Sequence, residues 1–355
     1  MMQHFKIYNR QDILAITRIR KFETKLGECV QVAEKGKTIE EVLKATNAPF
    51  VVLGVPEDIG VKANYGIGGA DSAWLPFLRA FLNIQSNDFL QGQEVLILGH
   101  FDFYDIITII ENNAGSPDER IEAYRHAVKT IDDEVEHVVK LVAQHGKIPI
   151  VIGGGHNNAY PCIKGAAKGL YQAGILPLAQ INVINLDAHA DYRPAEGRHS
   201  GNPFRYAEDD GYLEKYCIVG LHENYLPQNS WMDLVNNPFF DLVTYEDIFL
   251  RGKYSFTEAV LHAANFTEGN RCGLELDLDS IESTLSSAVS PAGVSTLQAR
   301  QYVHMAARET SPAYLHICEG ATQLLDGRRS DSTGKLISYL VSDFVKAWEN
   351  KETVL

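Results

Sequence analysis

The sequence has few cysteines and little positive charge. Its five cysteines are an odd number, lie far apart and include no CxxC pair. Four of them lie in or beside apolar runs, where a free cysteine behaves as a small buried residue, so we expect them to be reduced and structural. Lysine and arginine number 32 against 46 aspartates and glutamates, a net charge of −14. Because binding to phosphates depends on clustered positive charge, we expect no nucleic-acid partner.

Long hydrophobic runs are also missing. The chain contains no run of about 18 apolar residues, the length that a membrane span requires. Residues 1–20 lack the continuous apolar segment of a signal peptide. We therefore expect a soluble, cytoplasmic protein with no membrane partner. With 45% hydrophobic and 22% charged residues, the composition is that of a folded globular protein.

Short apolar runs alternate with helical patterns along most of the chain. The runs have the length and β-branched content of strands, and they are nearly continuous in hydrophobicity, which is typical of parallel strands covered on both faces. The pattern predicts an α/β fold, a single three-layer, doubly wound domain with a mainly parallel sheet. Its predicted strands lie at residues 48–55, 94–99, 148–152, 181–186, 216–221, 271–278 and 314–318.

Helix signals divide the chain into two parts. The clearest helix begins with a capping box at Ser116, has proline at its first position and ends near Gly146. No linker or repeat interrupts the alternating pattern, so we expect a helical extension over residues 1–47 and one α/β domain over 48–355. The extension could cover an edge of the sheet or cap an oligomer interface, and we expect a homo-oligomer. Further helices are predicted over residues 9–26, 38–46 and 336–349.

Acidic residues and histidines follow three of the predicted strands directly, in the motifs GGGH, DAHAD and DLD. Alternate side chains of an extended backbone point to one side, so each motif can direct its polar groups one way. The carboxyl ends of parallel strands form the crevice of an open sheet, where the three motifs can converge. The groups concerned are His156, Asp187, His189, Asp191, Asp277 and Asp279.

Four carboxylates in one crevice need a compensating positive charge, which two divalent cations would supply. An oxygen-rich set with two imidazoles and no thiolate suits Mn²⁺ better than a structural zinc ion. Two such ions about 3.5–4 Å apart can lower the pKa of a shared water and favour hydrolysis. GGGH alone is a weak signal, and DLD alone could be a solvated strand end or a helix cap. Together the three motifs favour a binuclear metal hydrolase.

The three motifs resemble those of the arginase family, the ureohydrolases. That family's GG[DG]H turn, DAHxD strand end and DxD strand end occur here in the same order. The likeness extends from VPEDIGVKANYGIGGADSAW, near the first predicted strand, to LHICEGA, near the last. It implies that the six residues above bind two Mn²⁺ per subunit within an arginase-like metallohydrolase domain over residues 48–355. It also implies that Glu319 anchors the cationic group of the substrate.

Within that family the sequence looks most like the formimidoylglutamases. Gly155 stands where arginases usually have aspartate, and RHSGNPFR at 198–205 resembles their HSGTPF segment, with Asn202 in place of threonine. The resemblance implies hydrolysis of N-formimidoyl-L-glutamate to glutamate and formamide, a step of histidine degradation. Asp191 would then hydrogen-bond the attacking hydroxide while binding metal, and His199 would pass a proton to the leaving amine.

The loop that follows DAHAD is rich in arginine. Arg193, Arg198 and Arg205 place three positive charges in an otherwise acidic chain. Because arginine binds carboxylates bidentately, we expect this loop to bind the glutamyl part of the substrate, with Arg193, Asn202 and Arg205 as substrate-binding residues. The alternative for each arginine is an ordinary surface position or an ion pair with a nearby acid: Glu196, Glu208 or Asp209.

Other functions remain open from the sequence. SIES at residues 280–283 replaces the Asp-Pro pair that commonly follows DxD in arginases and agmatinases. The same site could therefore act on arginine, agmatine or a guanidino acid and release urea. A metal-binding pseudoenzyme is a further alternative. A deacetylase of related fold would not need six ligands, and a nucleotide-binding protein would need a spaced GxGxxG.

Overall fold

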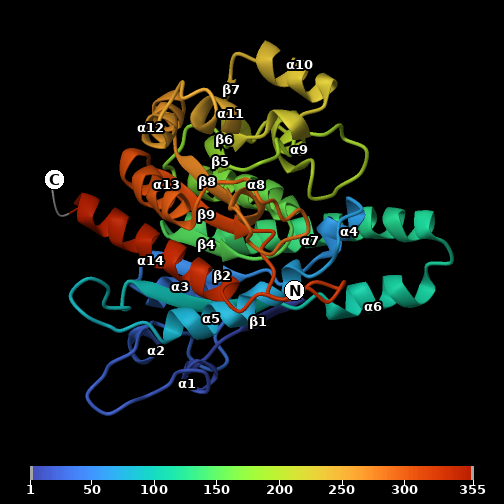
Figure 1. Cartoon of the computed structure of the whole chain (residues 1–355). Coiled ribbons are helices and arrows are strands. Elements are labelled where there is room, and N and C mark those ends of the chain that lie inside the picture. The colour runs from blue at the N-terminus through green and yellow to red at the C-terminus, as the bar shows by residue number, and fades with distance from the viewer. Residues whose placement is uncertain (1–2, 353–355) are drawn as a thin grey trace.

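The computed structural model describes residues 3–352, with side chains through residue 348. The described residues form a nine-stranded sheet in the order β1-β3-β2-β4-β9-β8-β5-β6-β7. Neighbouring strands are parallel except for β1 and β3, which confirms the predicted α/β fold. Figure 1 shows the sheet with helices packed around it. The strands are β1 (Phe5–Ile7), β2 (Phe50–Gly54), β3 (Val95–Phe101), β4 (Ile148–Ile152), β5 (Ile181–Leu186), β6 (Leu213–Leu221), β7 (Phe240–Thr244), β8 (Cys272–Asp277) and β9 (Pro312–Cys318).

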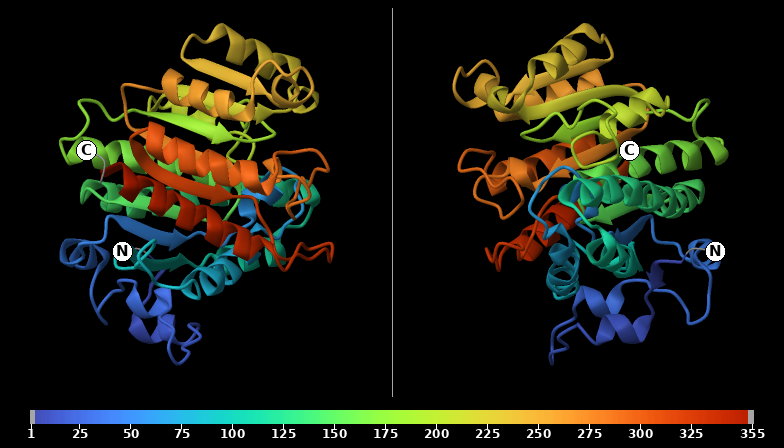
Figure 2. Two further views of the ribbon diagram at one scale, coloured as in Figure 1. Left: turned by 60° about the vertical axis from the view of Figure 1, so that its left-hand side comes forward. Right: turned by 90° about the vertical axis from the view of Figure 1, so that its right-hand side faces the viewer.

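Helices cover both faces of the sheet and complete the three layers (Figure 2). Successive residues of a strand face opposite layers: Phe50 and Val52 of β2 pack in one hydrophobic core, and Val51 and Leu53 in the other. The core of Phe50 lies beneath α5 (Trp74–Leu82), α12 (Phe256–Phe266), α13 (Thr296–Glu309) and α14 (Thr333–Glu352). The other lies beneath α3 (Ile39–Ala45), α4 (Ile59–Ala63), α6 (Tyr104–Asn113), α7 (Pro117–Gln144), α8 (Ala159–Gln172) and α9 (Pro203–Asp209).

The remaining helices are short. Four 3₁₀ turns are described, and the two that come after β4 and β8 each contain a predicted ligand. These elements are α1 (Arg10–Leu14), α2 (Leu26–Cys29), α10 (Gln228–Asn236), α11 (Tyr245–Phe249), η1 (Ala70–Ala73), η2 (His156–Asn158), η3 (Glu223–Tyr225) and η4 (Leu278–Ser280).

The capping signals of the sequence mark real helix ends. The Ser116 hydroxyl accepts a hydrogen bond from the backbone N–H of Glu119 at 3.2 Å, and α7 begins at the next residue, Pro117. The helix ends at Gln144, two residues before Gly146, whose φ of 70° favours glycine. The predicted capping box before α3 and the predicted C-terminal helix are also confirmed.

The predicted helix over residues 9–26 is wrong beyond its first turns. α1 ends at Leu14, and the side chain of Asn83 then binds the backbone that a longer helix would use. Asn83 Oδ1 accepts from the N–H of Arg18 at 2.7 Å, and its Nδ2 donates to the carbonyl of Ile16 at 3.0 Å. Because these bonds satisfy the chain locally, the helix gains nothing by continuing.

Two edge strands, β1 and β7, were not predicted. β1 runs antiparallel to β3 and extends the sheet with residues from before β2. Gly99 of β3 permits this pairing, because a Cβ there would lie 1.9 Å from the carbonyl oxygen of Lys6. All five cysteines are free and four are buried, as predicted. Among the described residues, no helix is long and apolar enough to cross a membrane.

Candidate metal centre

Four neighbouring strands, β4, β9, β8 and β5, carry the predicted site at their carboxyl ends. After β4 the chain turns through Gly153 and Gly154, with φ of 89° and 76°, and reaches His156 in η2. A Cβ on Gly154 would lie 2.8 Å from the carbonyl oxygen of Val55, so the turn needs glycine there. The turn delivers a fully buried histidine to the edge of the sheet.

The DAHAD segment reaches the site as a turn. β5 ends at Leu186, and Asp187 Oδ1 accepts the backbone N–H of His189 at 2.7 Å. Asp191 has φ of 45°, a left-handed conformation that is uncommon for residues other than glycine. The extended alternation predicted for this segment is therefore wrong, although its side chains do converge. Local hydrogen bonds and a strained residue bring them together.

DLD behaves in the same way. Asp277 is the last residue of β8, and its Oδ1 accepts the backbone N–H of Asp279 at 2.8 Å. Asp279 lies in the 3₁₀ turn η4 rather than on the strand. Both carboxylates are almost completely buried. The short turn η4 thus keeps the side chain of Asp279 close to that of Asp277.

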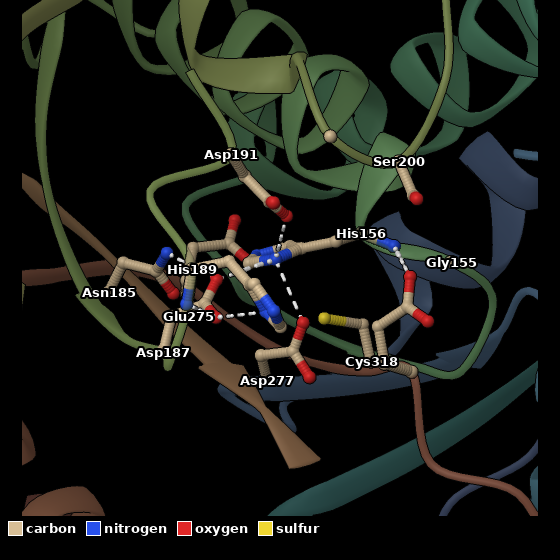
Figure 3. A network of polar contacts seen from close by, with 12 residues as sticks. Gly155, His156, Asn185, Asp187, His189, Asp191, Ser200, Glu275, Asp277 and Cys318 are labelled. Atoms are coloured by element: carbon tan, nitrogen blue, oxygen red, sulfur yellow. Dashed lines mark hydrogen bonds and ion pairs between the residues drawn. The ribbon is translucent and has the colours of Figure 1, made fainter. Parts of the chain in front are cut away.

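The predicted ligands form two clusters that share Asp187. Figure 3 shows His156, Asp187, Asp191 and Asp277 of the first cluster, with His189 beside them. In the first, His156 Nδ1 lies 2.8 Å from a carboxylate oxygen of Asp191 and 3.2 Å from one of Asp187 and one of Asp277. In the second, His189 Nδ1 lies 3.2 Å from Asp279 and 3.6 Å from the other oxygen of Asp187. A carboxylate that offers one oxygen to each cluster is suited to bridging two cations.

The electrostatics of the site favour a cation. Burial and the charge of Asp187 raise the pKa of Asp191 to about 6. Burial and the charges of Asp279 and Asp187 also raise the pKa of Asp277 well above its ordinary value. Burial opposes protonation of His189, yet the charge of Asp279 and the neighbouring carboxylates raise its pKa. The cluster thus attracts positive charge, as a proton or as a metal ion.

The donor atoms also fit a metal pair. Although His156 Nδ1 is buried among three carboxylates, it makes no hydrogen bond of acceptable geometry, and neither does the buried Oδ1 of Asp279. A buried polar atom without a partner is costly, so these atoms are suited to coordinate an ion. Four carboxylates with two imidazoles form an oxygen-rich set that Mn²⁺ accepts.

A cavity of about 270 Å³ opens above the two clusters. Its floor includes His189, Asp191, Asp277, Asp279 and Glu319. Glu319 follows β9 with φ of 61°, and its Oε1 accepts the backbone N–H of His156 at 2.8 Å. Burial raises the pKa of Glu319 to about 8. The walls of the cavity include Asn64, Arg193, Ser200, Tyr225 and Ser287.

The sequence model of the arginase family matches residues 48–344, which is most of the chain. The chain belongs to the arginase family. Curated relatives include a formimidoylglutamase of Aromatoleum aromaticum, 29% identical over 185 residues, and one of Streptococcus pyogenes serotype M6, 28% identical over 259 residues. The first match spans 50% of this chain and about half, 49%, of that relative, and the second spans 70% and 68%.

Solved structures of the family share the fold. The formiminoglutamase of Trypanosoma cruzi with Mn²⁺ superposes with a TM-score of 0.68 at 20% identity and covers 92% of this chain and 98% of its own. The formimidoylglutamase of Bacillus subtilis gives 0.69 at 16% identity, covering 96% and 99%. The arginase-like architecture predicted from the motifs is therefore confirmed.

In this arginase-family chain, the three loop arginines go to three different places. Arg193 lines the cavity, half-exposed, with Nη2 donating to Glu196 at 3.2 Å. Arg205 does not line the cavity: it pairs with Asp209 and Asp233 at the surface. Arg198 is buried against Asp132 of α7, which its Nε and Nη2 contact at 2.9 and 3.2 Å. The structure thus brings one of the three to the cavity.

Asn202 and His199 are completely buried within the loop, and neither lines the cavity. Asn202 Oδ1 accepts from Arg198 Nη1 at 2.9 Å and from the backbone N–H of His199 at 3.1 Å. Nδ1 of His199 accepts the N–H of Gly201 at 3.0 Å. Burial lowers the pKa of His199 to about 4. Both side chains therefore hold the loop in shape, and their roles toward substrate stay predictions from the sequence.

Some polar groups of the site were missed in the sequence. Asn185 Nδ2 donates to Asp187 Oδ2 and to Tyr216 Oη, both at 3.0 Å, and Glu275 lies beside His156 and His316. The signal was available, because both Asn185 and Glu275 interrupt apolar strands two residues before a predicted ligand. A polar residue at that spacing shares the ligand's face of the strand.

Proposed function

We propose that this arginase-family hydrolase binds two divalent cations and cleaves a C–N bond of a linear amidine. Its oxygen-rich set of ligands favours Mn²⁺ as the cation. The observation that carries the proposal is the pair of ligand clusters that share Asp187 beneath a cavity. One ion would be held by His156, Asp187, Asp191 and Asp277, and the other by Asp187, His189 and Asp279.

When bound, two such ions lower the pKa of a water molecule and supply hydroxide at neutral pH. Asp191 is the residue suited to hydrogen-bond the attacking water, the role that the sequence resemblance implies. Its side chain belongs to the first ligand cluster and reaches the cavity with 13% exposure.

Glu319 would orient the amidinium group of the substrate. The backbone of His156 fixes one of its carboxylate oxygens, which leaves the other to the cavity that Glu319 lines. Burial raises its pKa to about 8, and a substrate cation beside it would keep it ionised. The charge pair would then place the amidine carbon over the metal ligands.

His199, the residue predicted to donate a proton to the leaving amine, does not line the cavity. The Nε2 atom of His199 lies 3.0 Å from Asn202 Nδ2 and 3.3 Å from Glu196 Oε1, so its polar contacts are with other residues of the loop. The shuttle role of His199 stays a prediction from the sequence resemblance.

For the substrate we propose N-formimidoyl-L-glutamate, which yields glutamate and formamide. The names of the relatives support this choice, and Arg193 offers the cavity a guanidinium for one carboxylate. Asn64, Ser200 and Ser287 offer neutral polar groups for the second carboxylate.

A guanidino acid is the second candidate. Arg198 and Arg205 form ion pairs away from the cavity. Among the described residues that line the cavity, Arg193 is therefore the one arginine, which suits a substrate with a single carboxylate. Such a substrate would release urea rather than formamide.

The test is a substrate panel with Mn²⁺-loaded protein. N-formimidoyl-L-glutamate, arginine, agmatine and guanidinobutyrate are incubated separately, and formamide and urea are measured by NMR. The proposal expects formamide with the first compound and little urea with the others. Urea from arginine or guanidinobutyrate, without formamide, would establish the second candidate instead. No product with any compound, from protein that carries two Mn²⁺, would contradict both and leave a metal-binding pseudoenzyme.

A further inference from the structure

Behind His156 lies a buried carboxylate that belongs to neither ligand cluster. Glu275 is the fourth residue of β8, fully buried and two residues before Asp277. A carboxylate buried without partners is strongly unfavourable, so its position in the centre of the sheet calls for specific contacts.

Strand β9 supplies two of these contacts. Glu275 Oε2 lies 2.6 Å from Nδ1 of His316, and its Oε1 accepts a hydrogen bond from the Tyr314 hydroxyl at 2.6 Å. Glu275 and His316 are direct partners in the parallel register, and Tyr314 is paired with Gly273. A Cβ at Gly273 would lie 2.5 Å from the Tyr314 ring, so glycine makes room for the tyrosine. The register of two strands therefore builds the holder of Glu275.

The third contact is His156 itself. Its Nε2 lies 3.4 Å from Glu275 Oε2, while its Nδ1 faces Asp187, Asp191 and Asp277. Neither ring nitrogen makes a hydrogen bond of acceptable geometry, so a small rotation of the ring would be needed to close this contact. A histidine that binds a metal through one nitrogen usually donates the N–H of the other to a carboxylate, which fixes the ring orientation.

We propose that Glu275 is a positioning residue for one of the two metal sites. It accepts the Nε2–H of His156 and so directs the Nδ1 lone pair toward the cluster of Asp187, Asp191 and Asp277. Tyr314 and His316 hold Glu275 in that orientation. Of the two clusters that share Asp187, His156 belongs to the first alone, so Glu275 sets the affinity of that metal site and leaves the site of His189 and Asp279 unchanged. The inference rests on the proposed metal centre but not on the identity of the substrate.

The decisive variant is Glu275→Gln, which keeps the size of the side chain and removes its charge. Mn²⁺ titrations of the metal-free protein, followed by calorimetry and by EPR, resolve the two binding steps. We expect one step to weaken by about 10- to 100-fold, the usual loss when such a partner of a metal-binding histidine is removed, and the other to stay unchanged. His156→Asn should weaken the same step. An equal loss at both steps, or no loss at either, would overturn the proposal.

Two tyrosines provide a matched pair that does not depend on the folding of Glu275→Gln. Tyr314→Phe removes the hydroxyl that donates to the Glu275 carboxylate. Tyr302→Phe removes a buried hydroxyl that donates to the Glu275 backbone carbonyl at 2.9 Å. We expect Tyr314→Phe to weaken the same Mn²⁺ step as Glu275→Gln, by several-fold, and Tyr302→Phe to leave both steps unchanged. Equal effects of the two variants would overturn the proposal.

The wild-type titration separates this inference from the proposed function. If the wild-type chain does not bind two Mn²⁺, the metal centre itself is contradicted. If it binds two and the Glu275→Gln protein binds both as tightly, only the positioning role is contradicted. The melting temperature of the metal-free variants checks for general damage, since loss of a positioning contact should act on metal binding more than on the empty fold.

Discussion

The strand ends and the loop at 192–205 are both dense in ionisable residues, yet they behave differently. The strand-end groups predicted to meet do meet, in two clusters around Asp187. The three loop arginines predicted to act together separate, one to the cavity, one to the surface and one to the interior. Position in the sequence thus determines the partners of the strand-end residues more closely than those of the loop arginines.

Sheet geometry explains the difference. β4, β9, β8 and β5 are neighbours, so residues at their carboxyl ends share one edge, and their side-chain bases can shift little. An arginine on a loop has a long, flexible side chain that can reach several acidic residues, including ones that are distant in the sequence. Arg198 pairs with Asp132, 66 residues earlier on α7, and its guanidinium also contacts the faces of the Tyr160 and Tyr206 rings. The sequence around Arg198 does not predict this ion pair.

The largest effect should come from the residue that both clusters share. We expect Asp187→Ala to lower kcat/KM on the order of 10³-fold, because it removes a carboxylate from both cation sites at once. Steady-state kinetics of the Mn²⁺-loaded variant, against the wild type, measures this loss. A variant that keeps more than a tenth of the activity would mean that the strand-end cluster is not the reactive centre.

The next effect concerns stability and separates Arg198 from a substrate ligand. Arg198→Met leaves Asp132 buried without its partner, so we expect the free energy of unfolding to fall by about 3–5 kcal/mol. Arg205→Met breaks surface ion pairs and a contact with the Tyr192 ring, and should cost less than about 2 kcal/mol. Urea unfolding of both variants makes the comparison. If Arg198→Met were as stable as wild type but raised KM, the loop would be acting on substrate after all.

Features set by local sequence or by strand register can be predicted, and features that depend on distant partners cannot. The central strands, α7 and the six candidate ligands are local or register-determined features, and the sequence is sufficient to place them. β1 is missed because three residues carry too little pattern, and β7 because Asp241 interrupts its apolar run. The helix over 9–26 fails because the partner that ends it, Asn83, lies far along the chain. The destination of Arg198 likewise depends on α7, which no local motif indicates, whereas the Arg193–Glu196 and Arg205–Asp209 pairs are the local alternative that the sequence offered.

The buried histidine of the loop should make stability depend on pH. Burial lowers the pKa of His199 to about 4, below the value of about 6.5 for an exposed histidine. Between these values the unfolded chain binds more protons than the folded one, so stability falls as the pH drops from about 7 to 4. We expect this residue to contribute on the order of 2 kcal/mol to that fall. His199→Gln should flatten the stability curve over this range, and an unchanged slope would show that the ring is protonated in the fold.

The smallest effect distinguishes Arg193, on the cavity wall, from Arg205, which lies away from it. Arg193→Glu should raise KM for an anionic substrate by about tenfold, because it reverses the charge on the cavity wall. Arg205→Glu lies away from the cavity and should change KM by no more than about twofold. Initial-rate measurements with N-formimidoyl-L-glutamate test the pair. Equal increases in KM would restore the loop as a joint carboxylate clamp.

The central claim is that strand-end residues form two cation sites with one shared aspartate. The most direct measurement is the manganese content of the wild-type chain after saturation and gel filtration, with the EPR spectrum of the same sample. We predict two Mn²⁺ per chain with the spectrum of a magnetically coupled pair. One Mn²⁺ per chain, or two uncoupled ions that persist in Asp187→Ala, would contradict the account.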